Sequence, residues 1–371
     1  MRIGLDATPL LGQQTGIGRY VANLFAALPA AAPQDDLVAT AFTARGAGDL
    51  PAAVPPGVAV RARPAPARLL RAGWQRGEWP PVEWLAGRVD VFHGTNFVLP
   101  PARSAAGVLT VHDLAYLLHA DTVSADSARL REIVPRGIAR AGVVCVPSRS
   151  VRDEVADTYR LPDDRLEVTP LGVDPAWAAA TPLPAEQLAA LGLDRPYLLF
   201  VGNQEPRKNL PVLLAAFAAV CAAEPDGPLL ALAGPAGWGT PPEIPDVARR
   251  RVVRLGYLEQ EPLQATVAAA RALVFPSRYE GFGLPPLEAF AAGVPVVASD
   301  IPPVRETVGQ DPELARLVPP DDVDALAEAL AADWACDEPA RRQRRRALAA
   351  RYSWTATASA THAAYLRAAA R

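Results

Sequence analysis

Short apolar runs alternate with longer segments of helical period along the chain, and this alternation most constrains the fold. Runs rich in Val, Leu and Ile are typical of strands buried on both faces of a parallel sheet. The clearest helices of the first half span residues 17–28, 128–140 and 150–159. Strands are expected there at residues 2–6, 37–43, 58–62, 89–93, 107–111, 142–146 and 166–169. The pattern predicts an α/β fold with doubly wound sheets.

The alternation restarts after residues 171–175 (LGVDP), where glycine and proline end the strand pattern. Strands of the second half are expected at residues 197–201, 229–233, 251–255, 272–275, 294–298 and 315–318. Because 371 residues exceed what one hydrophobic core usually serves, we predict two Rossmann-like domains, at residues 1–173 and 174–352. Such sheets bind ligands beyond the carboxyl ends of their strands, so a central cleft between facing domains is the expected site.

Composition argues against several classes of protein. A formal net charge of −3 provides no basic field for nucleic acid. No apolar stretch approaches the ~20 residues that a membrane-spanning helix needs. The amino terminus runs into a strand without a charged and then apolar leader. A cytoplasmic protein is therefore expected.

The segment at residues 275–289 carries the strongest chemical signal. A strand ends, a glycine-containing loop follows, and a helix opens with proline in its first turn. Such a helix start favours a diphosphate, because it offers backbone N–H groups and a partial positive charge. Glu280 in the loop is a candidate for sugar hydroxyls, and Glu288 in the helix for a ribose. The alternative is an ordinary loop with two solvated glutamates.

Residues 201–210 (VGNQEPRKNL) form a second strand, loop and helix start. Arg207 and Lys208 could together neutralise a diphosphate, because Arg offers a planar fork and Lys a compact charge. The alternative is a solvated helix start. Cations next to a helix N-terminus oppose its dipole, and a bound anion would resolve that conflict.

Residues 12–20 (GQQTGIGRY) follow the first strand and open a helix, where a Rossmann fold cradles phosphate. A dinucleotide fingerprint needs a third glycine where Val21 stands, so a nicotinamide or flavin site is disfavoured.

His112 follows a buried strand, and its neutral imidazole could donate to a hydroxyl. The alternative is a histidine that caps the strand end or bonds to Asp113. His119 and His362 are expected at the surface.

Residues 68–79 mix cations with aromatics, which is typical of a surface that rests on anionic lipid. Ordinary packing of Trp74 and Trp84 over the sheet is the favoured interpretation. Tyr257 follows another strand and could be buried in the core.

In combination and order, these motifs resemble those of the retaining GT-B glycosyltransferases of family four, which include many bacterial mannosyltransferases. The resemblance covers essentially the whole chain. It implies a Glu-x7-Glu signature at Glu280 and Glu288, phosphate-binding cations at Arg207 and Lys208, and a sugar contact at His112. It also implies that the turn at Tyr257 lines a nucleobase pocket. The implied donor-binding residues are Gly16, Gly18, Asn203, Tyr257, Leu258, Gly281, Phe282, Gly283 and Leu284.

The resemblance also implies that His93 lies near the acceptor side and that a helix at residues 353–371 crosses back onto the first domain. One departure is Asn203, because many relatives have Arg directly after this glycine. Arg207 is the candidate substitute, and Lys208 is the safer assignment.

The implied activity is transfer of a hexose from a nucleotide diphosphate sugar, with retention, to a saccharide or lipid-linked saccharide in polysaccharide biosynthesis. GDP-mannose is the preferred donor, and UDP-sugars and dTDP-rhamnose follow. No metal or cofactor is expected, because no Asp-x-Asp pair stands at a strand end in a metal-binding setting. Peripheral contact with the inner membrane surface is left open. Alternatives are a sugar-nucleotide epimerase of the same architecture and a non-catalytic nucleotide-sugar-binding subunit.

Overall fold

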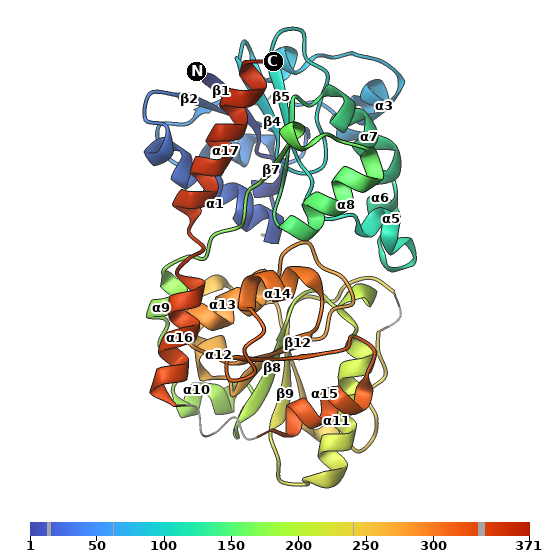
Figure 1. Cartoon of the computed structure of the whole chain (residues 1–371), viewed down its shortest axis with the longest axis vertical. Coiled ribbons are helices and arrows are strands. Elements are labelled where there is room, and N and C mark those ends of the chain that lie inside the picture. Colours follow the sequence, from blue (N-terminus) through green and yellow to red (C-terminus); the bar gives the residue numbers. More distant parts are fainter. Residues whose placement is uncertain (13–15, 62, 240, 333–337) are drawn as a thin grey trace. The chain divides into compact units, whose positions relative to one another are not determined.

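The computed structural model describes residues 1–12, 16–61, 63–239, 241–332 and 338–371. The chain divides into two compact units (Figure 1). Unit 1 contains residues 1–118, 125–172 and 353–371, and unit 2 contains residues 119–124 and 173–352. Six residues within the range predicted for the first domain, His119–Ser124, therefore belong to unit 2.

Unit 1 is built on a parallel sheet that has seven strands among the described residues, in the order β3-β2-β1-β4-β5-β6-β7. Its strands are β1 (Arg2–Asp6), β2 (Asp36–Thr40), β3 (Ala59–Val60), β4 (Val91–Gly94), β5 (Ala106–Thr110), β6 (Val143–Val146) and β7 (Leu166–Val168). The strand expected at residues 37–43 ends at Thr40, because the N–H of Phe42 donates to Thr8 Oγ1 (2.8 Å) instead of to a strand. The strand expected at residues 58–62 is shorter, and residue 62 lies outside the described part.

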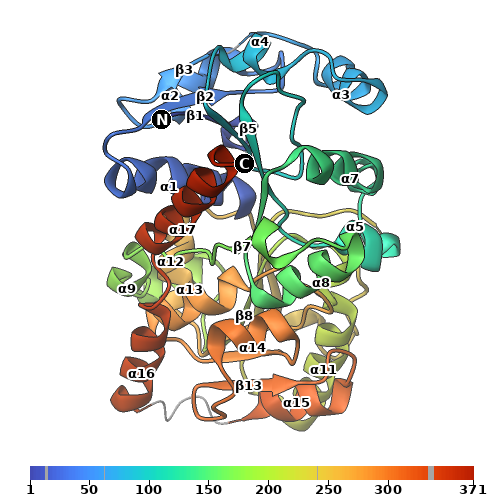
Figure 2. The ribbon, with the colours of Figure 1, turned by 45° about the horizontal axis from the view of Figure 1, so that its top comes forward.

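Helices cover both faces of this sheet (Figures 1 and 2). They are α1 (Gly16–Ala31), α2 (Leu50–Ala53), α3 (Ala67–Arg76), α4 (Val82–Ala86), α5 (Ala115–Leu118), α6 (Ala125–Ala128), α7 (Leu130–Arg140), α8 (Arg149–Tyr159) and α17 (Trp354–Ala369). The last helix, α17, packs along α1 and against β5 and β6. The carboxyl-terminal helix is thus a structural part of unit 1.

Unit 2 repeats the architecture with a parallel sheet whose described strands run in the order β10-β9-β8-β11-β12-β13. These are β8 (Tyr197–Val201), β9 (Leu229–Ala233), β10 (Val252–Gly256), β11 (Ala272–Phe275), β12 (Val296–Ser299) and β13 (Ala315–Val318). Its helices are α9 (Ala176–Ala179), α10 (Ala185–Ala190), α11 (Leu210–Ala223), α12 (Gln260–Ala269), α13 (Leu284–Ala292), α14 (Pro302–Val308), α15 (Val323–Ala331) and α16 (Pro339–Ala349). Arg345 of α16 is 1% exposed and donates to the carbonyls of Gly293 (2.8 Å) and Leu314 (3.2 Å), which ties α16 to the end of α13.

Both sheets are doubly wound, which confirms the predicted fold class. In each, the strand order reverses at one place, between β1 and β4 in unit 1 and between β8 and β11 in unit 2. Loops diverge at such a switch point and leave room beyond the strand ends, where doubly wound sheets bind ligands. The loops after β8 and β11 therefore mark the first place to look for a site in unit 2.

The aromatic residues near α3 differ from one another in burial. Trp74 is 4% exposed and donates from Nε1 to the carbonyl of Pro80 (2.9 Å), as expected for packing. Trp84 is 41% exposed, so the expectation that it covers the sheet is wrong. It lies instead under the guanidinium of Arg63, whose Cζ is 5.2 Å from the indole ring.

His93 lies in the core of unit 1 and is 0% exposed. Its Nδ1 is 2.8 Å from the Tyr365 hydroxyl, and its Nε2 is 2.7 Å from Thr110 Oγ1. Burial lowers the pKa of His93 to about 3, so the ring is neutral near pH 7. Both ring nitrogens are therefore engaged with Tyr365 of α17 and Thr110 of β5, and the implied position near the acceptor side stays a prediction.

Replacing Tyr365 with Phe should lower the free energy of unfolding by about 1–3 kcal/mol, because a buried ring nitrogen of His93 loses its partner. The control is Tyr159→Phe, whose hydroxyl meets the Tyr116 hydroxyl (2.8 Å) at a half-buried place where water can replace it. Urea unfolding followed by fluorescence measures both variants. Equal losses in the two would contradict a special role for the His93 contact.

Candidate active site

Two loops follow the strands at the switch point of unit 2. The first continues from β8 through a 3-10 turn, Pro206–Lys208, and the left-handed residue Asn209 (φ 59°) into α11. The second continues from β11 to Gly283, where α13 begins. Because β8 and β11 are parallel neighbours, both loops leave the same edge of the sheet.

A buried carboxylate, that of Glu280, connects the two loops. Glu280 Oε1 accepts from Lys208 Nζ (2.6 Å), and Glu280 Oε2 accepts from Arg207 Nη1 (2.8 Å). Arg207 Nη1 also donates to the carbonyl of Tyr279 (3.2 Å). The side chains of Arg207, Lys208 and Glu280 are 17%, 9% and 10% exposed. Three of the predicted site residues are thus brought together in one largely desolvated cluster.

The network extends to a residue that the sequence did not predict. Glu205 Oε2 accepts from Arg207 Nε (2.9 Å), and Glu205 Oε1 accepts from Asn203 Nδ2 (3.1 Å). A signal was available, because Glu205 is an acidic residue two positions before the predicted cation. The carboxylates of Glu205 and Glu280 compensate the cations beside the start of α11, so the expected conflict with the helix dipole is resolved within the protein.

Opposing effects set the ionisation of this cluster. Burial by itself raises the pKa of Glu280, but Arg207 and Lys208 overcome it and hold that pKa at about 2. Burial lowers the pKa of Lys208, and Glu280 counteracts part of that effect. Because the folded-state pKa of Glu280 lies below its ordinary value of 4.5, the stability it contributes is present above pH 4.5 and is lost toward pH 2.

Lys208 is the only lysine in the sequence, which has 36 arginines. Lys208 is buried, 7% exposed as a whole residue, and its side chain passes beside Gly202. The ammonium group also lies 4.9 Å from the centre of the Phe275 ring. A compact ammonium suits this buried place better than a planar guanidinium.

A third loop, after β9, packs backbone to backbone against the first. A Cβ at Gly234 would lie 2.1 Å from the Gly202 carbonyl oxygen, and one at Gly237 would lie 2.4 Å from that of Gln204. The N–H of Gln204 donates to the carbonyl of Pro235 (3.2 Å). Only glycine permits approaches this close, so the glycines fix the spacing of the two loops.

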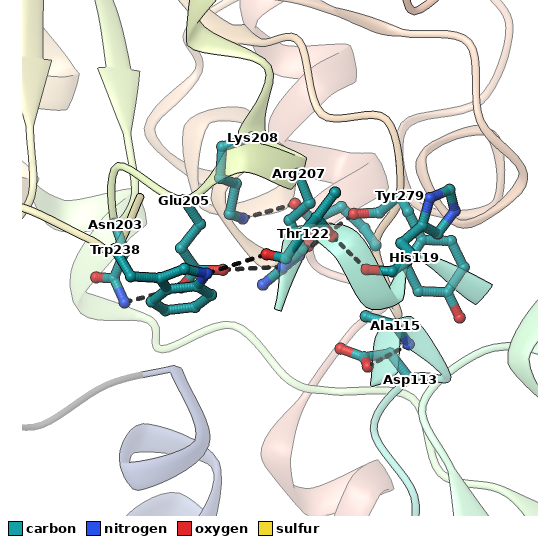
Figure 3. A network of polar contacts seen from close by, with 11 residues as sticks. Asp113, Ala115, His119, Thr122, Asn203, Glu205, Arg207, Lys208, Trp238 and Tyr279 are labelled. Carbon is teal, nitrogen blue, oxygen red and sulfur yellow. Dashed lines mark hydrogen bonds and ion pairs between the residues drawn. The ribbon is translucent and has the colours of Figure 1, made fainter. Parts of the chain in front are cut away.

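Residues 119–124 belong to unit 2 and pack against the loops that follow β9 and β11 (Figure 3). Trp238 Nε1 donates to the carbonyl of Thr122 (3.1 Å), and Thr122 is 6% exposed. The His119 ring lies 4.8 Å from the Tyr279 ring, centre to centre. His119 was expected as a plain surface residue, but it packs against the residue next to Glu280. Contacts this distant in sequence leave no local pattern, so the sequence could not predict them.

The start of α13 offers fewer donors than its position suggests. Gly283 caps the helix with φ 105°, where a side chain would be strained. Of the first three helical residues, Leu284, Pro285 and Pro286, only Leu284 has a backbone N–H. Glu288 lies one turn further on and is 4% exposed. The start of α13 therefore offers a diphosphate fewer backbone N–H groups than the sequence pattern predicted.

The remaining predicted residues of unit 2 differ in exposure. Phe282 is 6% exposed and packs edge-on against the Tyr352 ring at 5.8 Å, and Gly281 beside it is buried. Tyr257 is 40% exposed and Leu258 is partly buried, just after β10. Tyr257 is therefore on the surface, as a base-contacting residue would be, and the alternative of a core tyrosine is wrong.

Gly16 and Gly18 lie at the start of α1 in unit 1. Gly16 is exposed, and a Cβ there would meet nothing within 4 Å, whereas Gly18 is buried. Residues 13–15 of the predicted phosphate loop lie outside the described residues. A contact of either glycine with a donor phosphate remains a prediction.

His112 follows β5 in unit 1, edge-on to the rings of Tyr20 (5.1 Å) and Phe97 (5.4 Å). Its Nε2 donates to the carbonyl of Thr95 (2.9 Å), not to Asp113. Burial lowers the pKa of His112, so the ring is neutral and Nδ1 can only accept. His112 was expected to donate to a sugar hydroxyl, but its one ring proton is donated to the Thr95 carbonyl, so its other ring nitrogen could only accept from a hydroxyl.

His362 was expected at the surface. It is half-buried, and its Nε2 lies 2.8 Å from Asp35 Oδ2.

Comparison with known proteins identifies the family. Residues 14–177 match the model of glycosyltransferase family 4, and residues 195–333 match that of the glycosyl transferases group 1. O-antigen chain mannosyltransferase B of Escherichia coli is 34% identical over 250 residues, 64% of this chain and 63% of that protein. D-inositol 3-phosphate glycosyltransferase of Kineococcus radiotolerans is 32% identical over 315 residues, 77% of this chain and 70% of that protein. The chain belongs to the family 4 glycosyltransferases.

Solved structures show the fold of this glycosyltransferase. Sucrose-phosphate synthase of Thermosynechococcus elongatus has a TM-score of 0.69 at 21% identity, over 98% of both chains. HepE of Anabaena, solved in complex with UDP-glucose, has a TM-score of 0.67 at 18% identity, also over 98% of both chains. Together with the two doubly wound sheets, these likenesses show the GT-B fold. The match to the Escherichia coli mannosyltransferase spans just under two thirds of that protein's length.

Among the described residues of the glycosyltransferase, none of the helices is both long and apolar enough to cross a membrane. Within the same residues, no three His, Cys, Asp or Glu side chains gather in a way that could hold a metal ion.

Replacing Lys208 with Arg in this glycosyltransferase should cost about 1–3 kcal/mol of unfolding free energy although the charge is kept, because a larger guanidinium must fit into a buried site whose ammonium already bonds to Glu280. A matched control is Arg278→Lys, whose exposed side chain pairs with Asp321 and should cost less than about 1 kcal/mol. Urea unfolding measures both. Unchanged stability of the Lys208→Arg variant would contradict the steric account.

Proposed function

We propose that the glycosyltransferase moves a hexose from a nucleotide diphosphate sugar to a saccharide or lipid-linked saccharide, with retention of the anomeric configuration. The observation that carries this proposal is the pair of desolvated cations, Arg207 and Lys208, held by Glu280 at the switch-point loops of unit 2. Departure of a nucleoside diphosphate needs stabilisation of developing negative charge, and preorganised cations in a water-poor site supply it.

The carboxylates near these cations are proposed to hold the donor's hydroxyl groups. Each oxygen of Glu280 accepts a hydrogen bond from a cation. An ionised carboxylate has about four acceptor positions, so Glu280 can still accept from sugar hydroxyls. The buried Glu288 on α13 is the candidate for a ribose. With its pKa held at about 2, Glu280 is an ionised acceptor at neutral pH and not a general acid.

GDP-mannose is the proposed donor. Its support is the resemblance of the amino-terminal and Arg207–Lys208 motifs to those of mannosyltransferases, together with the name of the Escherichia coli relative. UDP-sugars are the second candidate, since HepE was solved with UDP-glucose. We further propose that transfer is independent of metal, because Arg207 and Lys208 can neutralise the leaving diphosphate as a divalent cation would.

Titration with donors tests this proposal. A thermal-shift series with GDP-mannose, UDP-glucose, dTDP-rhamnose and ADP-glucose should show stabilisation, greatest for GDP-mannose, because a ligand of the native state raises its melting temperature. Lys208→Ala and Glu280→Ala should each lower turnover by about 100-fold or more while retaining the fold. Wild-type turnover in either variant would contradict the site, and release of an altered nucleotide sugar without acceptor would favour an epimerase.

A lipid-linked acceptor implies contact with a membrane surface, and unit 1 has a candidate patch. Leu69 is 69% exposed, Trp79 69% and Trp84 41%. Exposed arginines accompany them on α3, namely Arg68, Arg71 and Arg76. Aromatic and cationic side chains together suit an anionic lipid surface.

Co-sedimentation with phosphatidylglycerol vesicles tests this contact. Binding should exceed that to phosphatidylcholine vesicles and should fall severalfold in the Trp79→Ser variant, because the exposed indole no longer enters the interface. Equal binding of both proteins to both vesicles would contradict the proposal.

A further inference from the structure

Glu205 is the member of the charged network to which the proposed function gives no task. It is 7% exposed. Its two oxygens accept from Arg207 Nε (2.9 Å) and Asn203 Nδ2 (3.1 Å). It therefore occupies one edge of the guanidinium that is proposed to grip the leaving diphosphate.

The charges of this network already balance without any ligand. Arg207 and Lys208 supply two positive charges, and Glu205 and Glu280 supply two negative ones, joined at 2.9, 2.8 and 2.6 Å. A nucleoside diphosphate that enters must share the cations with both carboxylates. Like charges repel strongly where water is scarce, so each carboxylate weakens the hold on phosphate. The proposed function gives Glu280 a contact with the sugar that offsets this repulsion. It assigns no such contact to Glu205.

We propose that Glu205 is a positioning residue that orients Arg207 and at the same time limits its hold on the diphosphate, so that the nucleoside diphosphate leaves after transfer. This inference rests on the proposed function, because it requires the diphosphate to bind at Arg207 and Lys208. Product release is often the slow step in enzymes of this kind. A cation pair without a counter-anion would bind the product more tightly than turnover allows.

A glutamine at this position separates charge from geometry. Its carbonyl oxygen can accept from Arg207 Nε as Glu205 Oε2 does. Its amide can donate to Asn203 once the Asn203 amide turns its oxygen inward. Glu205→Gln therefore keeps both hydrogen bonds and removes only the negative charge. A residue that merely supports the loop would lose affinity or show no change in this variant, whereas a counter-anion would show a gain.

The test is calorimetric titration of the full chain with GDP and with UDP. In Glu205→Gln, the Kd of the nucleotide that the wild type binds should fall about 5- to 20-fold. Its steady-state kcat should fall, and product inhibition should strengthen. Glu205→Asp keeps the charge and should show no gain in affinity. The matched control is Glu186→Gln, the same charge change at an exposed residue of α10, and its Kd should equal that of the wild type.

Unchanged or weaker nucleotide binding by a folded Glu205→Gln variant would overturn the inference and make Glu205 a structural support. Glu205→Ala removes both hydrogen bonds together with the charge, so its gain in affinity should be smaller than that of Glu205→Gln. Loss of the fold in both variants, seen in their melting curves, would likewise show a structural role. Failure of the wild type to bind either nucleotide would be a different result, because it removes the proposed function itself.

Discussion

The buried contact of one carboxylate, Glu280, with two cations organises unit 2. Removing three charges from water is costly, and the cost is met only because each charge has a partner at hydrogen-bond distance. Unpaired, Lys208 would favour its neutral form in this position. Under the proposed function the same two cations also meet the diphosphate of the donor, so the interaction that holds the loops together would also set what they bind.

The sheet brings these residues together. Glu280 and Lys208 are 72 positions apart, and they meet because β8 and β11 are parallel neighbours at the point where the strand order reverses. Glycines then set the loop spacing, since side chains at Gly234 and Gly237 would collide with the backbone of the first loop. The strand order of the sheet thus brings the candidate site residues of unit 2 together, and the glycines fix how closely their loops approach.

The sequence predicted much of this, for identifiable reasons. Strand and helix alternation predicted both doubly wound sheets, and strand-end motifs predicted Glu280 and Lys208, because these signals are local. The sequence did not predict Glu205 as a partner of Arg207, the docking of His119–Ser124 against Trp238 and Tyr279, or the use of the His112 proton by Thr95. Each of these depends on contacts or hydrogen-bond directions that only the folded chain defines.

The only lysine in the chain permits a direct measurement of the central claim, that a diphosphate binds at Lys208. Protein grown with lysine labelled with carbon-13 at Cε gives one side-chain NMR signal. Adding GDP or UDP, whichever raises the melting temperature, should shift that signal with the same concentration dependence as the thermal effect. A nucleotide that stabilises the protein and leaves the Lys208 signal unmoved would contradict this account.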